Sequence, residues 1–288
     1  MSTRAALVAV EPAALTHRFP DDGFLRWELA AGRSAAEGGA AEGGAAAWVL
    51  AGAWAHAKTV DGRSRVVAGG DPADAADLLA ALVPARVVPE RLSVVREAVG
   101  LLRPDLAPVG GDDWDWFATT RAPTPRLPGE DRAVRADVAD PVVLGAVLEL
   151  LDGHSPRYSR DPRGSGATWW AIPDTSGEAG SEPGLAAVTA AESLPHAVHL
   201  ASIATRTDLR GQGLGSALTA AVTRAALADG AEAVVLGMYT DNDTARRMYR
   251  RLGFVDTHRW RSGRPAGYPV PGFSPREPPG RRPGRAAP

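Results

Sequence analysis

The chain has 288 residues and is 44% hydrophobic, which fits a globular protein of roughly two domains at about 150 residues per domain. Its 32 basic and 34 acidic side chains leave a net charge of −2, which argues against nucleic-acid binding, because that affinity needs excess Lys and Arg. The absence of cysteine excludes disulfides, thiol nucleophiles and Cys-ligated metals. With no signal-peptide pattern and no apolar stretch of about 20 residues, we expect a cytoplasmic protein without a membrane partner.

Residues 1–120 are predicted to form an N-terminal α/β half. The Ala/Gly-rich segment 30–47 can pack few large side chains and is predicted to be a flexible loop. The other predicted elements are, in chain order, strands at 47–54 and 65–68 around an Asp61-Gly62 turn, a helix from Asp71-Pro72 that ends before Pro84, a second helix at 89–102, and a strand at 114–119. The Pro-rich residues 121–130 are predicted to link the two halves.

Residues 131–262 are predicted to form a second, mixed α/β domain, and the Pro-, Gly- and Arg-rich residues 263–288 a disordered tail. The predicted elements are a strand at 132–138, a helix at 140–151, a strand at 169–172, a loop at 173–184, strands at 185–191 and 197–205, a glycine-rich turn at 210–215 with a helix ending near Gly230, a strand at 233–239, a helix at 242–252 and a strand at 254–260.

The turn from Arg210 to Ser216 lies between a predicted strand and a predicted helix. A helix amino terminus offers unsatisfied N–H groups and a positive dipole end, and glycines let the main chain approach a phosphate. Alternatively, the glycines only permit a tight, closely packed turn. The turn has no lysine, which excludes a nucleotide-triphosphate loop. A dinucleotide site, with Asp241 as its acid, is a distant second because the third glycine is missing and too few elements follow.

The second domain contains two gapped motifs. The first, Arg/Gln-x-x-Gly-x-Gly/Ala, is met by Arg210, Gly213 and Gly215. The second, Asn-x-x-Ala-x-x-x-Tyr-x-x-x-Gly-Phe, is met with every spacing by Asn242, Ala245, Tyr249, Gly253 and Phe254. Together they resemble the motifs of the GCN5-related N-acetyltransferase (GNAT) superfamily, and within it those of the FR47-like branch. The resemblance covers about residues 130–262. It implies a mixed-sheet GNAT fold and an acyltransferase that moves an acetyl group from acetyl-CoA to a primary amine, without a metal.

The resemblance also implies roles for single residues. The pyrophosphate of CoA would lie on the glycine turn, and the pantetheine arm would pair like an added strand with residues 203–205. Asn242 would bond the pantetheine, although an ordinary helix N-cap is its alternative role. Tyr249 would give a proton or hydrogen bond to the leaving thiolate, with a packed core tyrosine as the alternative. The predicted cosubstrate-binding residues are Ile203, Ala204, Thr205, Arg210, Gly211, Gln212, Gly213, Leu214, Gly215, Ser216 and Asn242.

The base that deprotonates the amine is less sharply defined. His199 is the first candidate, because strand alternation gives it the same parity as Ile203 and Thr205 if no bulge intervenes, and an ordinary pKa near 6.5 suits a base. Some relatives in the family carry a glutamate base at this position. As an alternative to the role of base, His199 is bonded to a neighbouring residue or faces solvent. Glu192 is the second candidate, and a chain of waters the third. The arginines of the 242–252 helix form a solvated face or contact the CoA 3′-phosphate.

The first half lacks both motifs, so we predict that it binds no CoA. It is interpreted as a degenerate copy of the same fold that shapes the acceptor pocket, with Gly69-Gly70-Asp71-Pro72 as a faint echo of the glycine turn. The aromatic segment 114–117 is predicted to be a buried strand that packs between the halves. A non-catalytic acyl-CoA sensor or scaffold is the second functional hypothesis. The amine acceptor is not identified by the sequence, and a homodimer is compatible with it.

Overall fold

The computed structural model describes residues 6–29, 46–60, 63–82, 89–155, 157–164, 166–175 and 184–268. Its helical segments are α1 (Ala14–Arg18), η1 (Leu25–Leu29), α2 (Pro72–Leu82), η4 (Arg96–Leu101), η5 (Glu130–Arg132), α3 (Pro141–His154), η6 (Thr207–Leu209), α4 (Leu214–Ala228) and α5 (Asp243–Arg251). Its strands are β1 (Val8–Val10), β2 (Ala46–Leu50), β3 (Ala53–Val60), β4 (Arg63–Gly70), β5 (Arg91–Val95), β6 (Pro108–Val109), β7 (Asp113–Thr119), β8 (Val134–Ala136), β9 (Thr168–Pro173), β10 (Leu185–Ser193), β11 (Ala197–Thr205), β12 (Ala233–Tyr239) and β13 (Val255–Pro265). No helix in this part of the chain is long and apolar enough to cross a membrane.

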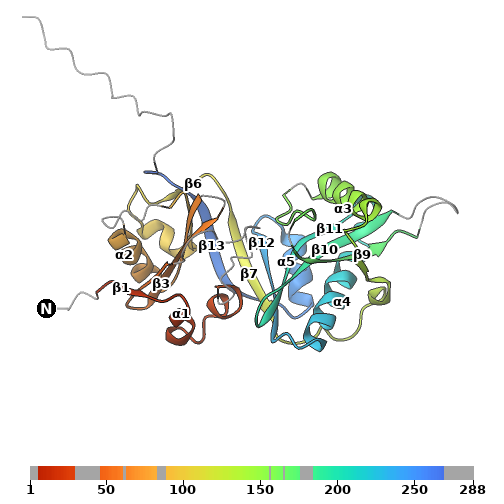
Figure 1. Ribbon diagram of the computed structural model, residues 1–288, viewed down its shortest axis with the longest axis horizontal. Helices are drawn as coiled ribbons and strands as arrows, with labels where there is room; N and C mark the ends of the chain where they lie inside the picture. The colour runs from red at the N-terminus through yellow and green to blue at the C-terminus, as the bar shows by residue number, and fades with distance from the viewer. Residues whose placement is uncertain are drawn as a thin grey trace, which may run out of the picture.

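The strands join in one 13-stranded mixed sheet, in the order β1-β2-β3-β4-β5-β13-β7-β12-β11-β10-β9-β8, with β6 paired to β13. The pairs β4–β5 and β11–β12 are parallel, whereas the other pairs are antiparallel. Figure 1 shows the N-terminal half on the left and the C-terminal half on the right, with the long strands β7 and β13 between them. The predicted α/β class with a mixed sheet is confirmed.

The two halves exchange strands at the centre of this sheet. β7 comes from the first half but pairs with β12 of the second, and β13 comes from the second half but pairs with β5 of the first. The two exchanged strands also pair with each other. Residues 121–129, where a linker was predicted, form turns and irregular structure. Residues 121–129 thus connect the two halves of the sequence, and the strands on both sides of this connection belong to one sheet.

Each half contains the same parallel unit of strand, helix and strand. In the first half it is β4–α2–β5, with pairs from Arg65–Arg91 to Ala68–Val94. In the second half it is β11–α4–β12, with pairs from Ala197–Ala233 to Leu200–Leu236. Antiparallel strands precede both units, β2 and β3 in one half and β9 and β10 in the other. A mixed sheet thus precedes residue 121, which the interpretation of a tandem fold requires.

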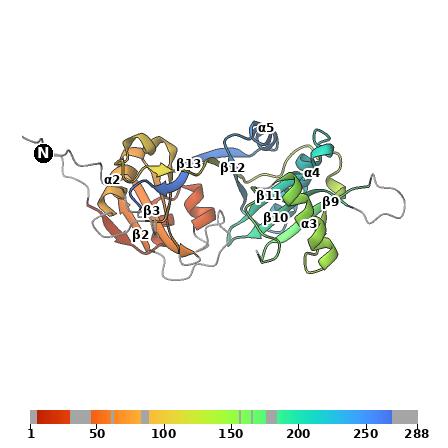
Figure 2. The ribbon, with the colours of Figure 1, turned by 90° about the horizontal axis from the view of Figure 1, so that it is seen from above.

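The core of each half is built around the exchanged strands. In the C-terminal half, α4 and α5 cover one face of the sheet and α3 the other, as Figure 2 shows. In the N-terminal half, Phe24 lies against the fully buried rings of Trp116 and Trp260, with centroids 5.1 and 4.7 Å away. Trp116 belongs to that core, whereas its neighbour Phe117 belongs to the core under α4. Since side chains alternate along a strand, β7 joins both cores, which confirms the packing predicted for the aromatic segment.

Three sequence expectations need correction. The helix predicted at 89–102 is wrong, because Arg91–Val95 is the strand β5 and a 3₁₀ turn follows it. The apolar residues of β5 fill a central position between β4 and β13, and this packing outweighs the helical pattern. The strand predicted at 47–54 is two strands, β2 and β3, that reverse at Ala51.

The tail predicted from residue 263 begins later, because β13 continues through Gly263, which pairs with Leu92, and ends at Pro265. Some predictions lie outside the described residues and stay predictions. They concern the loop at 30–45, the turn at 61–62, most of the loop at 173–184, and the tail from 269 onward.

Candidate active site

A cavity of about 660 Å³ lies between the two halves. Strands β11 and β12 and helix α5 line it from the C-terminal half, and β3, β4 and β5 line it from the N-terminal half. The exchanged strands complete it, with Trp114 and Trp116 from β7 and Ser262 and Arg264 from β13. Its volume is in the range of small-molecule sites. The strand exchange therefore creates a pocket that neither half could form alone.

The strands β11 and β12 separate where they reach the cavity. Among the described residues their ladder ends at Leu200–Leu236, although β11 continues to Thr205 and β12 to Tyr239. On its other side β11 stays paired with β10, up to the pair Ala187–Thr205. The edge of β11 that faces β12 is consequently open beyond residue 200. Such an edge can accept an extended ligand as an added strand.

A bulge interrupts β11 within this open stretch. The register with β10 shifts between Val188 and Ala190, and Ser202 has a positive φ of 52°. The Ser202 hydroxyl accepts a hydrogen bond from the backbone N–H of Arg160 at 2.9 Å, which holds the bulge in place. Because of this extra residue, simple alternation does not give His199 and Ile203 the same face. The condition of the predicted parity, that no bulge intervenes, is therefore not met, although both residues line the cavity.

The glycine turn opens α4 with two glycines in the left-handed region, Gly211 at φ 81° and Gly213 at φ 80°. A Cβ built on either glycine would meet no atom of the described chain within 4 Å, so the space in front of the turn is open. Gly215 differs, because its Cβ would stand 2.9 Å from Thr205 Oγ1. Both readings of the turn thus apply to different residues: Gly211 and Gly213 leave an open cradle, and Gly215 lets α4 pack against β11.

Arg210 does not face this cradle. Its guanidinium donates to the backbone oxygens of His154, at 2.8 Å, and Thr205, at 3.3 Å. The His154 ring also contacts the Thr207 hydroxyl at 2.8 Å. Arg210 therefore ties the end of α3 to the end of β11, which is a structural role. Of the other turn residues, Gln212 is exposed, Leu214 is buried in the core and Ser216 is intermediate.

Helix α5 carries two of the predicted site residues to the cavity. Asn242 is its N-cap, with Oδ1 accepting from Ala245 N–H at 3.0 Å, and Asn242 also lines the cavity. Tyr249 lies two turns later, packs against the rings of Phe117 and Phe254, and lines the cavity as well. Burial raises the pKa of the Tyr249 phenol, so the hydroxyl keeps its proton at neutral pH.

The two candidate bases occupy different environments. His199 lines the cavity and meets the edge of Trp116, with ring centroids 5.2 Å apart. Burial, with the nearby Arg160 charge, lowers the pKa of His199 to about 3, so its ring is neutral at pH 7. Glu192 is bound by Arg160 through two hydrogen bonds of 2.7 and 3.0 Å, and it is not among the described residues that line the cavity. The structure thus brings His199 to the cavity, whereas Glu192, its partner across β10 and β11, is engaged by Arg160.

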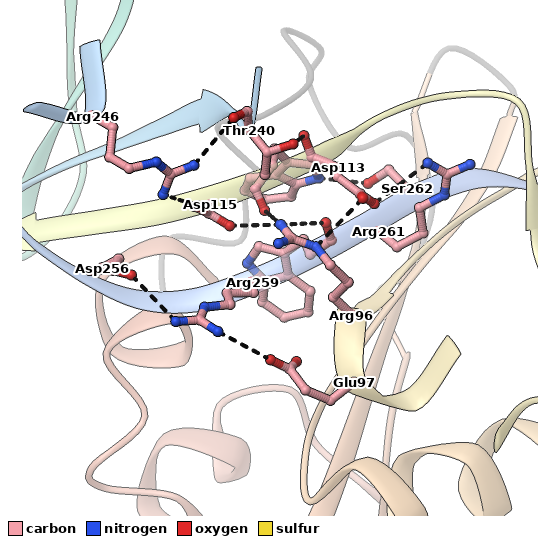
Figure 3. A network of polar contacts seen from close by, with 12 residues as sticks. Arg96, Glu97, Asp113, Asp115, Thr240, Arg246, Asp256, Arg259, Arg261 and Ser262 are labelled. Atoms are coloured by element: carbon pink, nitrogen blue, oxygen red, sulfur yellow. Dashed lines mark hydrogen bonds and ion pairs between the residues drawn. The ribbon is translucent and has the colours of Figure 1, made fainter. Parts of the chain in front are cut away.

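A buried carboxylate, Asp115 of β7, anchors the helix that carries Tyr249. Arg246 of α5 and Arg96 of η4 both donate to Asp115, which lies between them in Figure 3. Arg246 also reaches the backbone oxygen of Thr240 at 3.5 Å. The predicted solvated face of α5 is therefore wrong for Arg246, which links α5 to both halves. No motif could reveal this link, because its partners meet only through the strand exchange.

The remaining arginines of α5 lie nearer the surface. Arg250 pairs with Asp256 at 3.1 Å, and Arg247 donates to the Thr244 hydroxyl at 3.3 Å. Contact of this face with a CoA 3′-phosphate stays a prediction. In the described part of the chain, no group of three or more His, Asp or Glu is arranged to hold a metal ion.

Sequence reasoning missed the charged residues that face the cavity from outside the motifs. Arg157, in the loop after α3, binds Asp112 at 2.9 Å and Asp241 at 3.0 Å, and it lies 3.8 Å above the centre of the Tyr239 ring. Asp241 therefore pairs with Arg157, a role different from the ribose contact of a dinucleotide site. The N-terminal half contributes further cations, Lys58, Arg63, Arg65 and Arg91. These cations lie side by side because β3, β4 and β5 are paired in the sheet. The sequence analysis predicted a helix at 89–102 instead of β5, so it did not predict this arrangement.

Comparisons with known proteins agree with this geometry. Residues 153–254 match the model of the acetyltransferase (GNAT) family. A GCN5-related N-acetyltransferase from Sphaerobacter thermophilus is similar in structure, with a TM-score of 0.50 and 18% identity over 89% of this chain and 94% of that one. A Drosophila protein has a TM-score of 0.51 and 11% identity over 90% of this chain and 89% of its own. A GCN5-related N-acetyltransferase from Kribbella flavida has 21% identity and a TM-score of 0.45 over 73% of this chain and 86% of that one.

The family match and the structural matches cover different parts of the chain. No curated protein is significantly similar in sequence to the chain. At such low identities the structural likeness establishes the fold alone, and it extends over both halves. The chain has a GNAT fold, and the family match covers the part that contains the open turn, the diverging strands and most of α5.

Proposed function

We propose that the protein is an N-acetyltransferase that moves an acetyl group from acetyl-CoA to a primary amine held in the cavity between the halves. The observation that carries the proposal is the open edge of β11, which lies beside an open glycine turn and leads to Tyr249. The family match over residues 153–254 supports it, because members of this family are generally acyltransferases that use acetyl-CoA. Membership of the FR47-like branch and a cytoplasmic location stay predictions.

The chain offers suitable groups for the pyrophosphate and the pantetheine arm of acetyl-CoA. The backbone amides of residues 211–216 would hold the pyrophosphate, because the helix start leaves N–H groups and the glycines leave space. The backbone of residues 203–205 and the Asn242 side chain would hold the pantetheine arm. Arg210 is left out of this set, because its backbone N–H donates to the Thr207 carbonyl at 3.3 Å and its guanidinium to His154 and Thr205. Acetyl-CoA would supply the acetyl group as a thioester, so direct transfer to an amine yields an amide and a free thiol.

The cavity residues would promote this transfer mainly by position. Holding both substrates together makes the reaction effectively unimolecular. The raised pKa of Tyr249 keeps a proton on its hydroxyl but makes the phenol a weak acid, so the hydroxyl is suited to donate a hydrogen bond that stabilises the departing thiolate. The lowered pKa of His199 keeps its ring neutral but makes it a weak base. We therefore expect His199 to orient the amine and water to accept the amine proton.

The proposal is tested by calorimetric titration with acetyl-CoA and desulfo-CoA, followed by thiol release with a panel of amines. We expect both CoA compounds to bind, and thiol release that depends on an amine. Binding without release from any amine would favour the alternative, a non-catalytic acyl-CoA sensor or scaffold. A folded sample that binds neither compound would contradict both hypotheses.

A further inference from the structure

Helix α5, which brings Asn242 and Tyr249 to the cavity, has little apolar contact with the rest of the chain. All nine of its residues are described, and only Tyr249 among them is buried. Ala245 and Met248 are partly buried against the same core. An isolated helix of fewer than about 12 residues is marginal in water, so α5 depends on contacts with neighbouring elements. Hydrophobic packing supplies few of these contacts, and the polar ones therefore matter for where the helix lies.

Strand β7 contacts α5 at two points on one side of the helix. Asn242, Arg246 and Tyr249 are four and three residues apart, a spacing that places them on the same side. The Tyr249 ring packs against Phe117 of β7, with centroids 6.0 Å apart. Arg246 donates a hydrogen bond to Asp115, which lies two residues before Phe117 and so on the same face of β7. A strand from the first half of the chain thus holds the side of α5 that carries the proposed site residues.

The contact with Arg246 ends a path along which charges alternate. Arg261 of β13 lies 3.5 Å from Asp113 of β7, and Asp113 lies 3.8 Å from Arg96 of η4. Arg96 donates to one oxygen of Asp115 at 2.6 Å, and Arg246 donates to the other. Figure 3 shows this path from β13 through β7 to α5. Each of the two carboxylates therefore lies between two guanidinium groups.

The link between Asp115 and Arg246 exceeds what charge neutralisation requires. The Asp115 side chain is 3% exposed, and a carboxylate so buried needs a cation beside it. Arg96 alone would meet this need. Arg246 is a second guanidinium on the same carboxylate, and in the described chain no other α5 side chain has a hydrogen bond or ion pair beyond residues 240–256. This link is therefore the polar contact that fixes α5 relative to the N-terminal half.

Resting on the proposed function, we propose that Asp115 is a positioning residue for acetyl transfer, which acts through Arg246 and α5 to place the Tyr249 hydroxyl beside the leaving thiolate. Asp115 and Arg246 are not among the described residues that line the cavity, so their effect passes through the helix. A misplacement of about 1 Å can cost as much as about 100-fold in rate. The N-terminal half then contributes to the transfer step itself, in addition to closing the cavity.

The first test compares Arg246→Gln with a matched control, Arg224→Gln on α4. The two arginine side chains are 19% and 23% exposed, and Arg224 binds the buried carboxylate of Glu130 at 3.1 Å, away from the cavity lining. With both substrates saturating in the thiol-release assay, we expect kcat of Arg246→Gln to fall about 10-fold. Acetyl-CoA affinity should be unchanged, because the glycine turn and the open edge of β11 remain. Arg224→Gln should keep the wild-type kcat at a similar loss of stability in urea.

An equal fall of kcat in both variants, or a wild-type kcat in Arg246→Gln, would overturn the inference. Asp115→Asn tests the other end of the link. It should lower kcat as much as Arg246→Gln does, and the double variant should be no slower.

The second test determines whether the link acts through the Tyr249 hydroxyl. Tyr249→Phe lacks this hydroxyl, so the addition of Arg246→Gln should lower kcat by no more than about twofold further. A merely structural contact would instead lower kcat by the same factor in either background. Such multiplying effects would overturn the inference.

Hydrogen–deuterium exchange of the α5 amides is a readout that needs no turnover. We expect faster exchange over residues 243–251 in Arg246→Gln than in the wild type and in Arg224→Gln, because the helix loses its contact with β7. Unchanged exchange would overturn the inference, as would faster exchange with a wild-type kcat. A wild type that releases no thiol with any amine would reject the proposed function. Faster exchange in Arg246→Gln would then still support the link from Asp115 to α5.

Discussion

The two halves contain the same strand–helix–strand unit, but only one has an open helix start. In the C-terminal half, a Cβ on Gly213 would meet no described atom within 4 Å. In the N-terminal half, a Cβ on Gly70 would lie 2.3 Å from the backbone oxygen of Gly52, and the Asp71 carboxylate accepts from the N–H groups of Ala73 and Asp74. The start of α2 is therefore occupied by its own chain. This difference explains how the same unit can occur twice while only one copy offers the proposed cosubstrate site.

The halves also differ after the second parallel strand. β12 is followed by α5, which brings Asn242 and Tyr249 to the cavity. β5 is followed by the short η4, whose Arg96 binds Asp115 and so supports α5 from the other half. We infer that the N-terminal half has kept the sheet and serves as a wall and a support. In the proposed function the fold thus divides the site, with the groups for the cosubstrate on the C-terminal half and the N-terminal half closing the cavity opposite them.

The largest expected effect comes from closing the open turn with Gly213→Val. A side chain at φ 80° is strained and fills the space assigned to the pyrophosphate, so acetyl-CoA affinity should fall at least 100-fold in calorimetry. Gly230→Val is a matched control, because Gly230 follows the other end of α4 at φ 100° and also has open space around it. It should lose stability by about the same 1–2 kcal/mol, but keep its affinity. Equal loss of affinity in both variants would contradict the assignment.

The second prediction concerns Tyr249 of α5, a helix that has no counterpart in the described part of the N-terminal half. Tyr249→Phe keeps the ring packing against Phe117 and Phe254 but removes the hydrogen-bond donor. We expect kcat for thiol release to fall by about 100-fold with little change in acetyl-CoA affinity. Tyr268→Phe, at a residue outside the cavity lining, should leave kcat unchanged. Wild-type kcat in Tyr249→Phe would remove the hydrogen-bonding role and leave the tyrosine as a core residue.

The C-terminal half was predictable from sequence to a much greater extent than the N-terminal half. The helix start at Gly213 and the N-cap at Asn242 depend on local chemistry, which short motifs record. The place of β5 depends on burial between β4 and β13, and β13 comes from the far end of the chain. The link through Asp115 depends on the same long-range pairing. Local patterns cannot contain that information, because a strand's neighbours are set by the whole sheet.

A third prediction uses a buried histidine in each half. His56 of β3 and His199 of β11 have pKa values lowered to about 4 and about 3, mainly by burial. In the unfolded chain both return to about 6.5, so below that pH the unfolded state binds more protons. The stability present above pH 6.5 is therefore lost as the pH falls, by about 2 kcal/mol per histidine between pH 7 and pH 5.

Urea unfolding at pH 7 and pH 5 measures this loss. His56→Gln and His199→Gln should each lose about 2 kcal/mol less than the wild type between the two pH values. His17→Gln, at an exposed position, should show the wild-type difference. A variant of either buried histidine that keeps the full wild-type pH dependence would mean that this ring is not held neutral in the folded protein.

The prediction with the smallest expected effect concerns the start of α2, which the Asp71 carboxylate and the Gly52 backbone occupy. Asp71→Ala removes the carboxylate that caps α2, which should cost about 1 kcal/mol of unfolding free energy. Asp140→Ala removes the cap of α3, where Asp140 accepts from Val142 N–H at 2.8 Å, and should cost a similar amount. Calorimetry should still find one acetyl-CoA per chain in Asp71→Ala, because the Gly52 backbone fills the turn beside Gly70. A second bound acetyl-CoA would instead show that one carboxylate alone separates the two halves in function.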